Sequence, residues 1–400
     1  MEYKKAGLIR KIMHKLYEKS FIFCGNAFTK PDKKLIVFSS EPDFSDNSRV
    51  LFDYMQENGY AEKYKFVWIV NEPDKFAGMP YKNTVFVQKN DEYMYLRRET
   101  LKYLMNAHYY IGTHIRQKRI RKSHCGQTII NLWHGCGFKD TQHMPWNDAF
   151  DYVLVPGDVF IETKSKFFGC SKDMILPIGY PRYDLFRKTN GGIADFVDKF
   201  RPNKDTKLVI WMPTFRKTGK NKYPEENIEY NFALPVLQST EELIQLDKIC
   251  RDKNVVILVK KHQYQQDFGI DDKELANIRF IDNNTFSDNN IQLYEFLPHT
   301  DALISDYSSV AIDYLLIDKP IGFTLDDYES YKKTRGFVFQ DPLEYMPGAH
   351  IYTFGELSEF IADVADGNRD AYKSERAEVR KHTNKYSSDF CKRIVERFEI

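Results

Sequence analysis

The chain of 400 residues is 42% hydrophobic and 15% aromatic, which excludes a disordered protein and is enough for the cores of two globular domains. Its formal net charge of +1 gives no overall attraction to nucleic acid. The six cysteines form no C-x-x-C pair, no run of about 18 apolar residues occurs, and there is no secretory signal. We therefore expect a reduced, cytoplasmic protein without a zinc motif or a membrane-spanning helix.

The N-terminal segment, residues 1–30, predicts a basic amphipathic helix. One helical face carries the apolar side chains Leu8, Ile9, Ile12, Met13 and Leu16. Much of the remaining surface is basic, with Lys4, Lys5, Arg10, Lys11, Lys15 and Lys19. Such a helix can lie in the interface of an anionic membrane, at about 1 kcal/mol for each basic residue near the surface. The alternative is a helix packed on the domain, with its basic side in solvent.

From residue 34 onward, short apolar runs alternate with helix-length amphipathic stretches. Strands are expected first at 35–40, 65–70, 83–87, 108–112, 128–133 and 151–157, with helices at 47–58 and 92–107. A basic run at 115–122 is either a solvated loop or a patch for lipid phosphates or an anionic acceptor. It lacks the interleaved aromatic residues of nucleic-acid grooves.

The polar stretch 187–206 interrupts this alternation and is interpreted as the connection between two domains. Beyond it, strands are expected at 207–213, 254–260, 277–282, 301–305 and 319–323, and helices at 239–253 and 389–400. The pattern predicts two consecutive α/β domains with mainly parallel sheets. They are assigned to residues 31–190 and 191–384, with a C-terminal helix over 385–400.

Ligands of open parallel sheets bind beyond the carboxyl ends of the strands, so polar residues that follow predicted strands are candidate site residues. In "WHGCGFK" (133–139), neutral His134 can accept a hydroxyl proton, and the amides of Gly135, Cys136 and Gly137 can point at phosphate oxygens. The alternative is a structural histidine beside a turn.

In "DYSSVAID" (306–313), Ser308 and Ser309 begin a predicted helix, either as N-caps alone or as ligands of a phosphate. Asp313, about one turn later, can meet a sugar or ribose hydroxyl.

Four further clusters carry positive charge, two of them at strand ends. Lys260, Lys261 and His262 can stabilise charge on a leaving phosphate, and the alternative is a solvated strand end. Pro213 and Thr214 also end a strand, with Arg216 close behind, or form a simple turn. Arg182 in "GYPRYD" and Arg335 in "TRGF" are suited to bidentate phosphate contact, or else form surface salt bridges.

Taken together, these clusters resemble the CDP-glycerol glycerophosphotransferase family of bacterial teichoic-acid and capsule synthesis, over residues 34–400. The family's Trp-His-Gly-Thr-Pro-Leu-Lys motif is similar to 133–139, with Cys136, Gly137 and Phe138 substituted. Five other motifs of the family follow in order, as "GYPRYD" (179–184), "PTFR" (213–216), "DYSSVAIDYLLIDKP" (306–320), "RGF" (335–337) and "MPG" (346–348).

The resemblance implies a GT-B-type fold, with two Rossmann-like domains that face a central cleft and a C-terminal closing helix. The N-terminal domain would take the acceptor and the C-terminal domain the donor. His134 would be the base, and His262 would contact the pyrophosphate, although Gln263 replaces the proline that usually follows. The other residues implied at the donor site are Gly135, Cys136, Gly137, Phe138, Arg182, Pro213, Thr214, Lys260, Lys261, Ser308, Ser309 and Asp313. Further phosphate contacts would come from Lys139, Arg216 and Arg335.

The implied reaction is phosphoryl transfer, in which a hydroxyl of a lipid-linked, undecaprenyl-type saccharide attacks the β-phosphorus of a CDP-polyol and CMP leaves. Glycerol is the expected polyol and ribitol the alternative. No metal or cofactor is expected, because side chains and amides would handle the charge and the chain has no Asp-x-Asp motif. The protein would be peripheral, on the cytoplasmic face of the cell membrane. Two rival hypotheses are a GT-B glycosyltransferase that uses a nucleotide sugar and an inactive membrane-bound scaffold.

Overall fold

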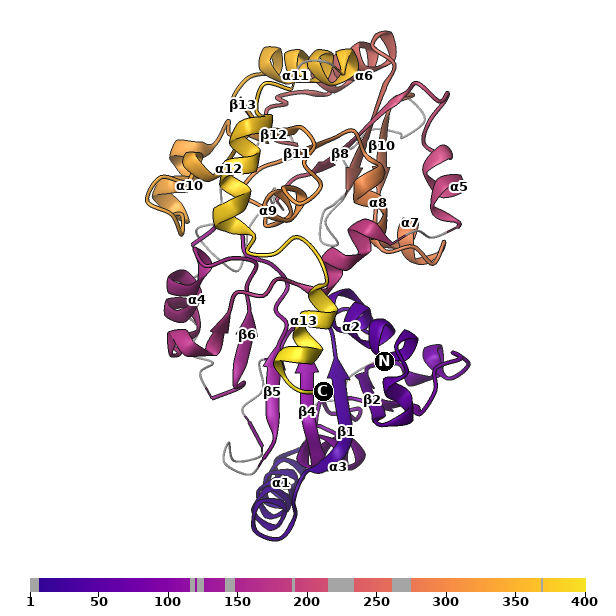
Figure 1. Cartoon of the computed structure of the whole chain (residues 1–400), viewed down its shortest axis with the longest axis vertical. Helices are drawn as coiled ribbons and strands as arrows, with labels where there is room; N and C mark the ends of the chain where they lie inside the picture. The colour runs from indigo at the N-terminus through magenta and orange to yellow at the C-terminus, as the bar shows by residue number, and fades with distance from the viewer. Residues whose placement is uncertain are drawn as a thin grey trace. The chain divides into compact units, whose positions relative to one another are not determined.

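The computed structural model describes residues 7–115, 119–120, 126–140, 148–188, 191–214, 234–260, 275–367 and 370–400 (Figure 1). The chain forms two compact units. Unit 1 comprises Met1–His134, His143–Arg182 and Ser388–Ile400, and unit 2 comprises Gly135–Gln142 and Tyr183–Ser387. The chain therefore passes from unit 1 to unit 2 at His134–Gly135 and again at Arg182–Tyr183, and it returns to unit 1 at Gln142–His143 and at Ser387–Ser388.

Unit 1 is built on a seven-stranded sheet with the order β3-β2-β1-β4-β5-β6-β7. Every pairing in it is parallel. Its strands are β1 (Asp32–Ser39), β2 (Lys65–Val70), β3 (Thr84–Gln88), β4 (Ala107–Gly112), β5 (Thr128–Asn131), β6 (Tyr152–Leu154) and β7 (Ile175–Leu176). Its α-helices are α1 (Leu8–Phe28), α2 (Asp46–Glu57), α3 (Arg98–Asn106), α4 (Phe160–Phe168) and α13 (Phe390–Arg397).

Unit 2 repeats this plan with a six-stranded sheet of order β10-β9-β8-β11-β12-β13, also parallel throughout. Its strands are β8 (Lys207–Met212), β9 (Val255–Lys260), β10 (Ile278–Ile281), β11 (Ala302–Ser305), β12 (Ile321–Thr324) and β13 (Ala349–Ile351). Its α-helices are α5 (Ile193–Asp198), α6 (Thr240–Asp252), α7 (Asn283–Ser287), α8 (Leu293–Phe296), α9 (Val310–Tyr314), α10 (Tyr328–Thr334), α11 (Phe354–Asp366) and α12 (Lys373–Thr383).

Both strand orders reverse in the middle of the sheet, between β1 and β4 in unit 1 and between β8 and β11 in unit 2. This is the doubly wound, Rossmann-like topology, whose ligands bind at the reversal point beyond the carboxyl ends of the strands. The predicted α/β class with parallel sheets is confirmed. The predicted cleft between two facing domains stays a prediction.

The structure corrects three predicted elements. The stretch 187–206 is no plain connection, because it contains α5, whose Ile193, Phe196 and Val197 are buried in unit 2. The predicted helix at 92–107 forms only as α3, because the Asp91 carboxylate accepts the amides of Tyr93 and Tyr95 and shapes the preceding residues into a loop. The strands β7 and β13 were not predicted, since they have only two and three residues.

The C-terminal helix begins at Phe390 and belongs to unit 1. Cys391 on α13 is fully buried and lies with its sulfur 3.9 Å from the Val50 carbonyl and 3.8 Å from that of Pro181. Just beyond the helix, the Phe398 carbonyl accepts a hydrogen bond of 2.6 Å from the Tyr109 hydroxyl. The chain thus returns to the first sheet at its end.

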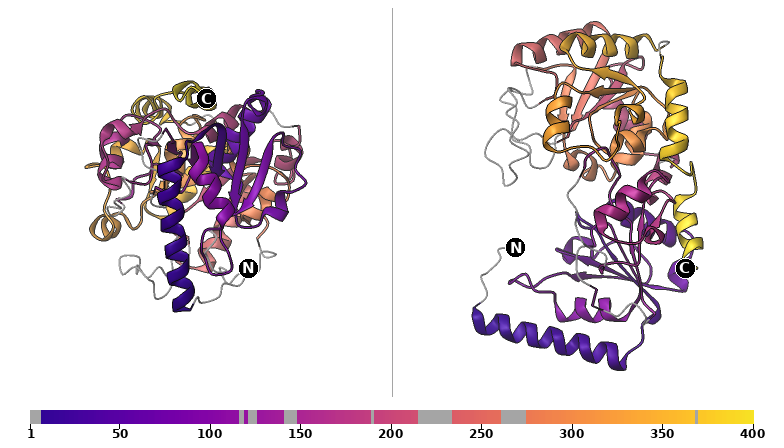
Figure 2. Two further views of the ribbon diagram at one scale, coloured as in Figure 1. Left: turned by 90° about the horizontal axis from the view of Figure 1, so that it is seen from below. Right: turned by 90° about the vertical axis from the view of Figure 1, so that its left-hand side faces the viewer.

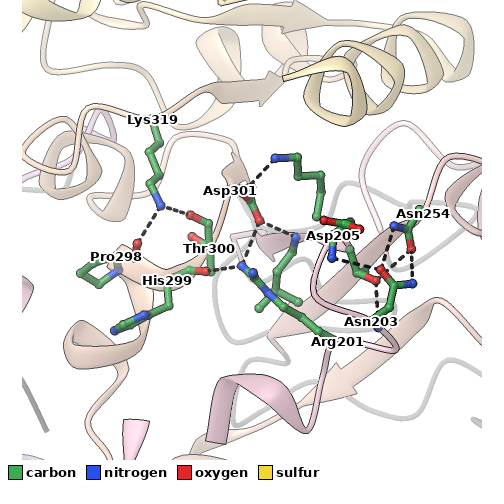
Figure 3. A network of polar contacts seen from close by, with 12 residues as sticks. Arg201, Asn203, Asp205, Asn254, Pro298, His299, Thr300, Asp301 and Lys319 are labelled. Carbon is green, nitrogen blue, oxygen red and sulfur yellow. Dashed lines mark hydrogen bonds and ion pairs between the residues drawn. The ribbon is translucent and has the colours of Figure 1, made fainter. Parts of the chain in front are cut away.

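A polar network ties the amino ends of the unit 2 strands (Figure 3). Asp301, just before β11, accepts bonds from the Arg201 guanidinium at 3.1 Å and from the Leu208 amide at 2.8 Å. Lys319, just before β12, donates to the carbonyls of Pro298 and Thr300 at 2.7 and 2.6 Å. Burial lowers the pKa of Lys319, and the nearby Asp301 opposes this shift.

Candidate active site

The neighbouring carboxyl ends of β4 and β5 bring His134 next to a second histidine. His134 follows β5, and its imidazole stacks on that of His114, which follows β4, with the ring centroids 4.5 Å apart and the planes 6° from parallel. The Trp133 ring lies 4.0 Å from that of His134 on a tilted plane. Both histidines are half-buried. The predicted base therefore stands at the sheet edge where Rossmann-like units bind ligands.

The backbone before His134 is held in an uncommon conformation. Trp133 has a φ of +54°, a left-handed value that is infrequent for a residue other than glycine. Its amide donates to Asn131 Oδ1 at 3.0 Å, and its carbonyl accepts from Asn47 Nδ2 at 2.8 Å. These two bonds fix the direction in which the chain leaves β5, and hence the place of the His134 ring.

Asn47, at the start of α2, links the two segments that carry predicted site residues. Its side chain is fully buried, and its Oδ1 also accepts the Arg182 amide at 3.1 Å. The Arg182 guanidinium donates to Asp46 Oδ1 at 3.0 Å and to the His134 carbonyl at 3.1 Å. Because Arg182 is only 5% exposed, its charge is paired inside unit 1, and its predicted contact with phosphate stays a prediction.

The reversal point of unit 2 joins Thr214 to Asp306. Asp306 follows β11 and is fully buried. Its carboxylate accepts the Thr214 amide at 2.8 Å and the Thr214 hydroxyl at 2.5 Å. The Pro213–Thr214 turn after β8 is thereby fastened to the strand beside it. No role was predicted for Asp306 itself, although it is the first residue of the "DYSSVAID" stretch (306–313).

Residues 135–140 cross into unit 2 and pack along the loop that contains the paired serines. A Cβ on Gly137 would lie 2.8 Å from the Ser309 amide nitrogen, so only glycine fits this close approach. The Phe138 carbonyl accepts the Val338 amide at 2.9 Å, and the Asp140 amide donates to the Gly336 carbonyl at 3.0 Å. The segment is thus bonded to the residues around Gly336, and Lys139 pairs with Phe337 in an isolated bridge.

This packing limits what two residues of the predicted donor site can offer, and their contact with a donor stays a prediction. The side chains of Cys136 and Phe138 are 0% exposed, so they belong to the core and can offer a ligand only their main chain. Phe138 packs against Phe323 and Phe339. Apolar side chains at these two positions of the motif fit a role in packing.

Ser308 and Ser309 are half-buried at the start of the short helix α9. The expectation that Ser309 caps this helix is wrong, because its backbone is already helical and its side chain makes no capping hydrogen bond. Phosphate binding by the two serines stays a prediction.

Asp313 is enclosed by aromatic side chains. It is fully buried, and its two oxygens accept hydrogen bonds from the hydroxyls of Tyr183 and Tyr294. The Phe186 ring stacks on both tyrosine rings, at 5.8 and 5.4 Å. The predicted contact of Asp313 with a ribose or sugar hydroxyl stays a prediction.

The basic cluster after β9 is described only in part. Lys260 donates to Asn283 Oδ1 at 2.8 Å, and burial lowers its pKa while the carboxylate of Asp282 opposes that shift. Arg335 ends α10, where its amide donates to the Tyr331 carbonyl at 2.9 Å. Lys261, His262 and Arg216 lie outside the described residues. Within the described ranges, no three His, Cys, Asp or Glu side chains gather closely enough to hold a metal ion.

A second surface of interest is the outward face of α1 (Figure 2). The opposite face of this helix packs on unit 1, where the Arg10 guanidinium lies 3.6 Å from the centre of the Tyr93 ring and His14 stacks on Tyr95 at 4.0 Å. Gly25 is buried against Met105. The outward face carries large apolar side chains that are 50–76% exposed, namely Leu8, Ile9, Ile12, Met13, Leu16 and Phe23.

This orientation differs from the one expected of a helix that only packs on the domain, while contact with a membrane stays a prediction. A helix that merely packed on the domain would turn its apolar face inward, whereas α1 turns it to the outside. Unpartnered apolar patches of this kind mark interaction surfaces. Over the part of the chain that the structure describes, no helix is both long and apolar enough to cross a bilayer.

Comparison with known proteins gives concordant results. The family model for CDP-Glycerol:Poly(glycerophosphate) glycerophosphotransferase matches residues 22–399. A teichoic acid poly(glycerol phosphate) polymerase of Bacillus spizizenii is 27% identical over 388 residues, which cover 90% of this chain and 91% of that protein. A teichoic acid ribitol-phosphate primase of the same species is 24% identical over 339 residues, covering 79% and 78%. The solved structure of the wall teichoic acid polymerase TagF has a similar fold, with a TM-score of 0.72, 21% identity and 98% coverage of both chains.

Proposed function

Because the chain belongs to the CDP-glycerol:poly(glycerophosphate) glycerophosphotransferase family and is a transferase, we propose that it transfers glycerol phosphate from CDP-glycerol to a hydroxyl of a lipid-linked saccharide in teichoic-acid or capsule-type polymer synthesis. The observation that carries this proposal is the His134 imidazole at the carboxyl end of β5, stacked on His114 at the end of β4, the strand that borders the reversal point of unit 1. Ribitol phosphate is the second candidate, because one relative is a ribitol-phosphate primase.

In the proposed mechanism, neutral His134 takes the proton of the acceptor hydroxyl as its oxygen attacks the β-phosphorus in line. A new P–O bond forms, the bond from that phosphorus to the bridging oxygen breaks, and CMP leaves with the electron pair. Lys260, His262 and the serines Ser308 and Ser309 neutralise the diphosphate, since phosphoryl transfer depends on positioning and charge stabilisation. We propose a GT-B arrangement, in which unit 1 takes the acceptor and unit 2 the donor.

Donor profiling tests this function. The purified protein is incubated with a lipid-disaccharide mimic and, separately, with CDP-glycerol, CDP-ribitol, a UDP-sugar or a GDP-sugar, and the released nucleotide and the product mass are measured. We expect CMP release and addition of glycerol phosphate with CDP-glycerol only. Release of UDP or GDP with sugar transfer would replace the proposal with a glycosyltransferase, and activity with CDP-ribitol alone would assign ribitol.

We further propose that α1 lies in the interface of an anionic membrane, on the cytoplasmic face where a lipid-linked acceptor is presented. Its outward apolar side chains would enter the lipid. Lys11, Lys15 and Lys19 on the same exposed helix would meet the headgroups. The ring contacts with Tyr93 and Tyr95 hold the helix in the orientation that this requires.

Replacing Ile12 and Leu16 by Glu should reduce flotation with phosphatidylglycerol vesicles by more than about tenfold, because burial of each large aliphatic side chain contributes about 1.5–3 kcal/mol. Turnover of a soluble acceptor should stay unchanged. The matched control is Ile244→Glu on α6, where another exposed aliphatic residue is 47% accessible and flotation should not change. Unchanged flotation of the double variant would refute the membrane proposal, and loss of turnover together with flotation would assign α1 a structural role.

A further inference from the structure

The strongest feature that the proposed function leaves unused is His114. This histidine was not among the predicted site residues, because "GTHI" follows an ordinary strand and matches no motif considered above. In the fold, β4 and β5 are neighbouring parallel strands, with Gly112 paired to Asn131. Residues two positions beyond Gly112 and three beyond Asn131 therefore emerge side by side, and these are His114 and His134.

The backbone of His114 is anchored on both sides. Thr113 is fully buried and Ile115 is 2% exposed. The Thr113 hydroxyl lies 3.1 Å from His114 Nδ1, within hydrogen-bond distance, which restrains rotation of the ring. A half-buried imidazole is thus held by the core of unit 1 although it stands at the sheet edge.

The geometry of the pair is that of a face-to-face stack, with planes 6° apart and centroids at 4.5 Å. Stacking covers the flat face of the His134 ring. The ring nitrogens lie in the plane of the ring, so the contact fixes the direction of these nitrogens while leaving them to make hydrogen bonds. A residue that packs on the face of the His134 ring can therefore orient it without occupying the nitrogen that must accept a proton.

We propose that His114 is a positioning residue for the reaction, which holds the imidazole of His134 in the plane needed to accept the acceptor proton. This inference rests on the proposed function. His114 itself does not exchange a proton with substrate, so its flat ring is the property that matters. Proton acceptance from a bound hydroxyl depends on the orientation of the base, whereas donor affinity does not.

Two substitutions separate the effect of the flat ring of His114 from the effect of its ring nitrogens. His114→Gln keeps a polar group for the Thr113 hydroxyl but has no ring, and we expect its kcat for CMP release to fall about tenfold while KM for CDP-glycerol stays within about twofold. His114→Phe keeps a flat ring without a titratable nitrogen, and we expect it to restore kcat to within about threefold of the wild type. The matched control is His108→Ala, at the other end of the same strand, which should behave like the wild type.

The proposal is overturned if His114→Gln retains wild-type kcat, or if His114→Phe is as slow as His114→Gln, since the second result would assign the role to the ring nitrogens. A second measurement separates this outcome from failure of the proposed function. The Trp133 ring displaces the Cε1–H resonance of His134 in every variant, so the stack is measured as a difference between variants: the resonance should move on His114→Gln, which removes the stacked ring, and stay ring-shifted in His114→Phe. If the wild type releases no CMP from CDP-glycerol, the proposed function fails, and the resonance alone tests the stack. The same resonance in the wild type and in His114→Gln would refute it.

Discussion

His134→Ala is expected to release CMP from CDP-glycerol more slowly than the wild type by about 10² to 10⁴-fold, the range over which a positioned general base contributes. Truncation removes the only group that we assign to the proton of the acceptor hydroxyl. The Trp133 carbonyl would still bond to Asn47, and the His134 carbonyl would still accept from Arg182. The backbone of the site should therefore survive, and the loss should appear in kcat with little change in KM for the donor.

The measurement is steady-state CMP release in the presence of acceptor, with product mass as the second readout. His108→Ala is again the matched control, because it removes an imidazole from the same sheet at the amino end of β4. Equal rates of acceptor-dependent CMP release for the wild type and His134→Ala would show that the base is a different group. The proposed mechanism would then have to be rebuilt around another residue.

Most of the strands were predictable because they are apolar runs that are largely buried, although β3, with one buried residue of five, was predicted as well. In β2 and β9 five of six residues are buried, as expected of parallel strands covered on both faces. Short outer strands give no such signal. Ile175–Leu176 becomes β7 only because β6 pairs with it, and that pairing depends on the completed sheet.

The location of the site was predictable for the same reason, since polar residues that follow buried strands collect at one edge of a parallel sheet. The residues that hold the site in shape were not. Asn47 reads as part of an ordinary helix start, and its role depends on contacts with Trp133 and Arg182, which lie 86 and 135 positions away. The proximity of His114 to His134 likewise depends on the pairing of β4 with β5.

Some motif residues serve the fold, and sequence alone cannot tell them from site residues. The Asp-Lys-Pro element at 318–320 belongs to a motif shared with the family, yet it lies at the amino end of β12, away from the carboxyl-end site of unit 2. There Lys319 bonds to two carbonyls, as Figure 3 shows, and Asp318 faces Arg376, with its oxygen 3.4 Å from the guanidinium Nε. These contacts give the element a role in holding unit 2 together.

Arg376→Met is expected to lower the free energy of unfolding of unit 2 by about 3 kcal/mol, because it removes one partner of a largely buried ion pair. Arg376 on α12 is 1% exposed and donates to both oxygens of Asp370, with the Nη1 bond at 2.7 Å. Because the methionine side chain fills most of the volume of the arginine side chain, the loss of unfolding free energy reports the charge contacts. Chemical denaturation measures it, followed by the fluorescence of a variant in which Trp211 is the one tryptophan left, and activity of the folded Arg376→Met protein should equal that of the wild type.

The Arg376–Asp370 pair also makes the difference in unfolding free energy between the wild type and Arg376→Met depend on pH. The hydrogen bond from Arg376 lowers the pKa of Asp370 below its usual 3.8, although burial opposes the shift. A carboxyl whose pKa is lower in the folded state stabilises the fold above the unfolded pKa and loses this contribution as the pH falls through the folded value. The difference in unfolding free energy between the wild type and Arg376→Met should therefore have its full size at neutral pH and become smaller below about pH 3.8.

Lys381→Met, which breaks an exposed pair with Glu378 on the same helix, is the control and should change the free energy of unfolding by less than about 1 kcal/mol. If Arg376→Met were as mild as this control, the buried pair would not be a source of stability for unit 2.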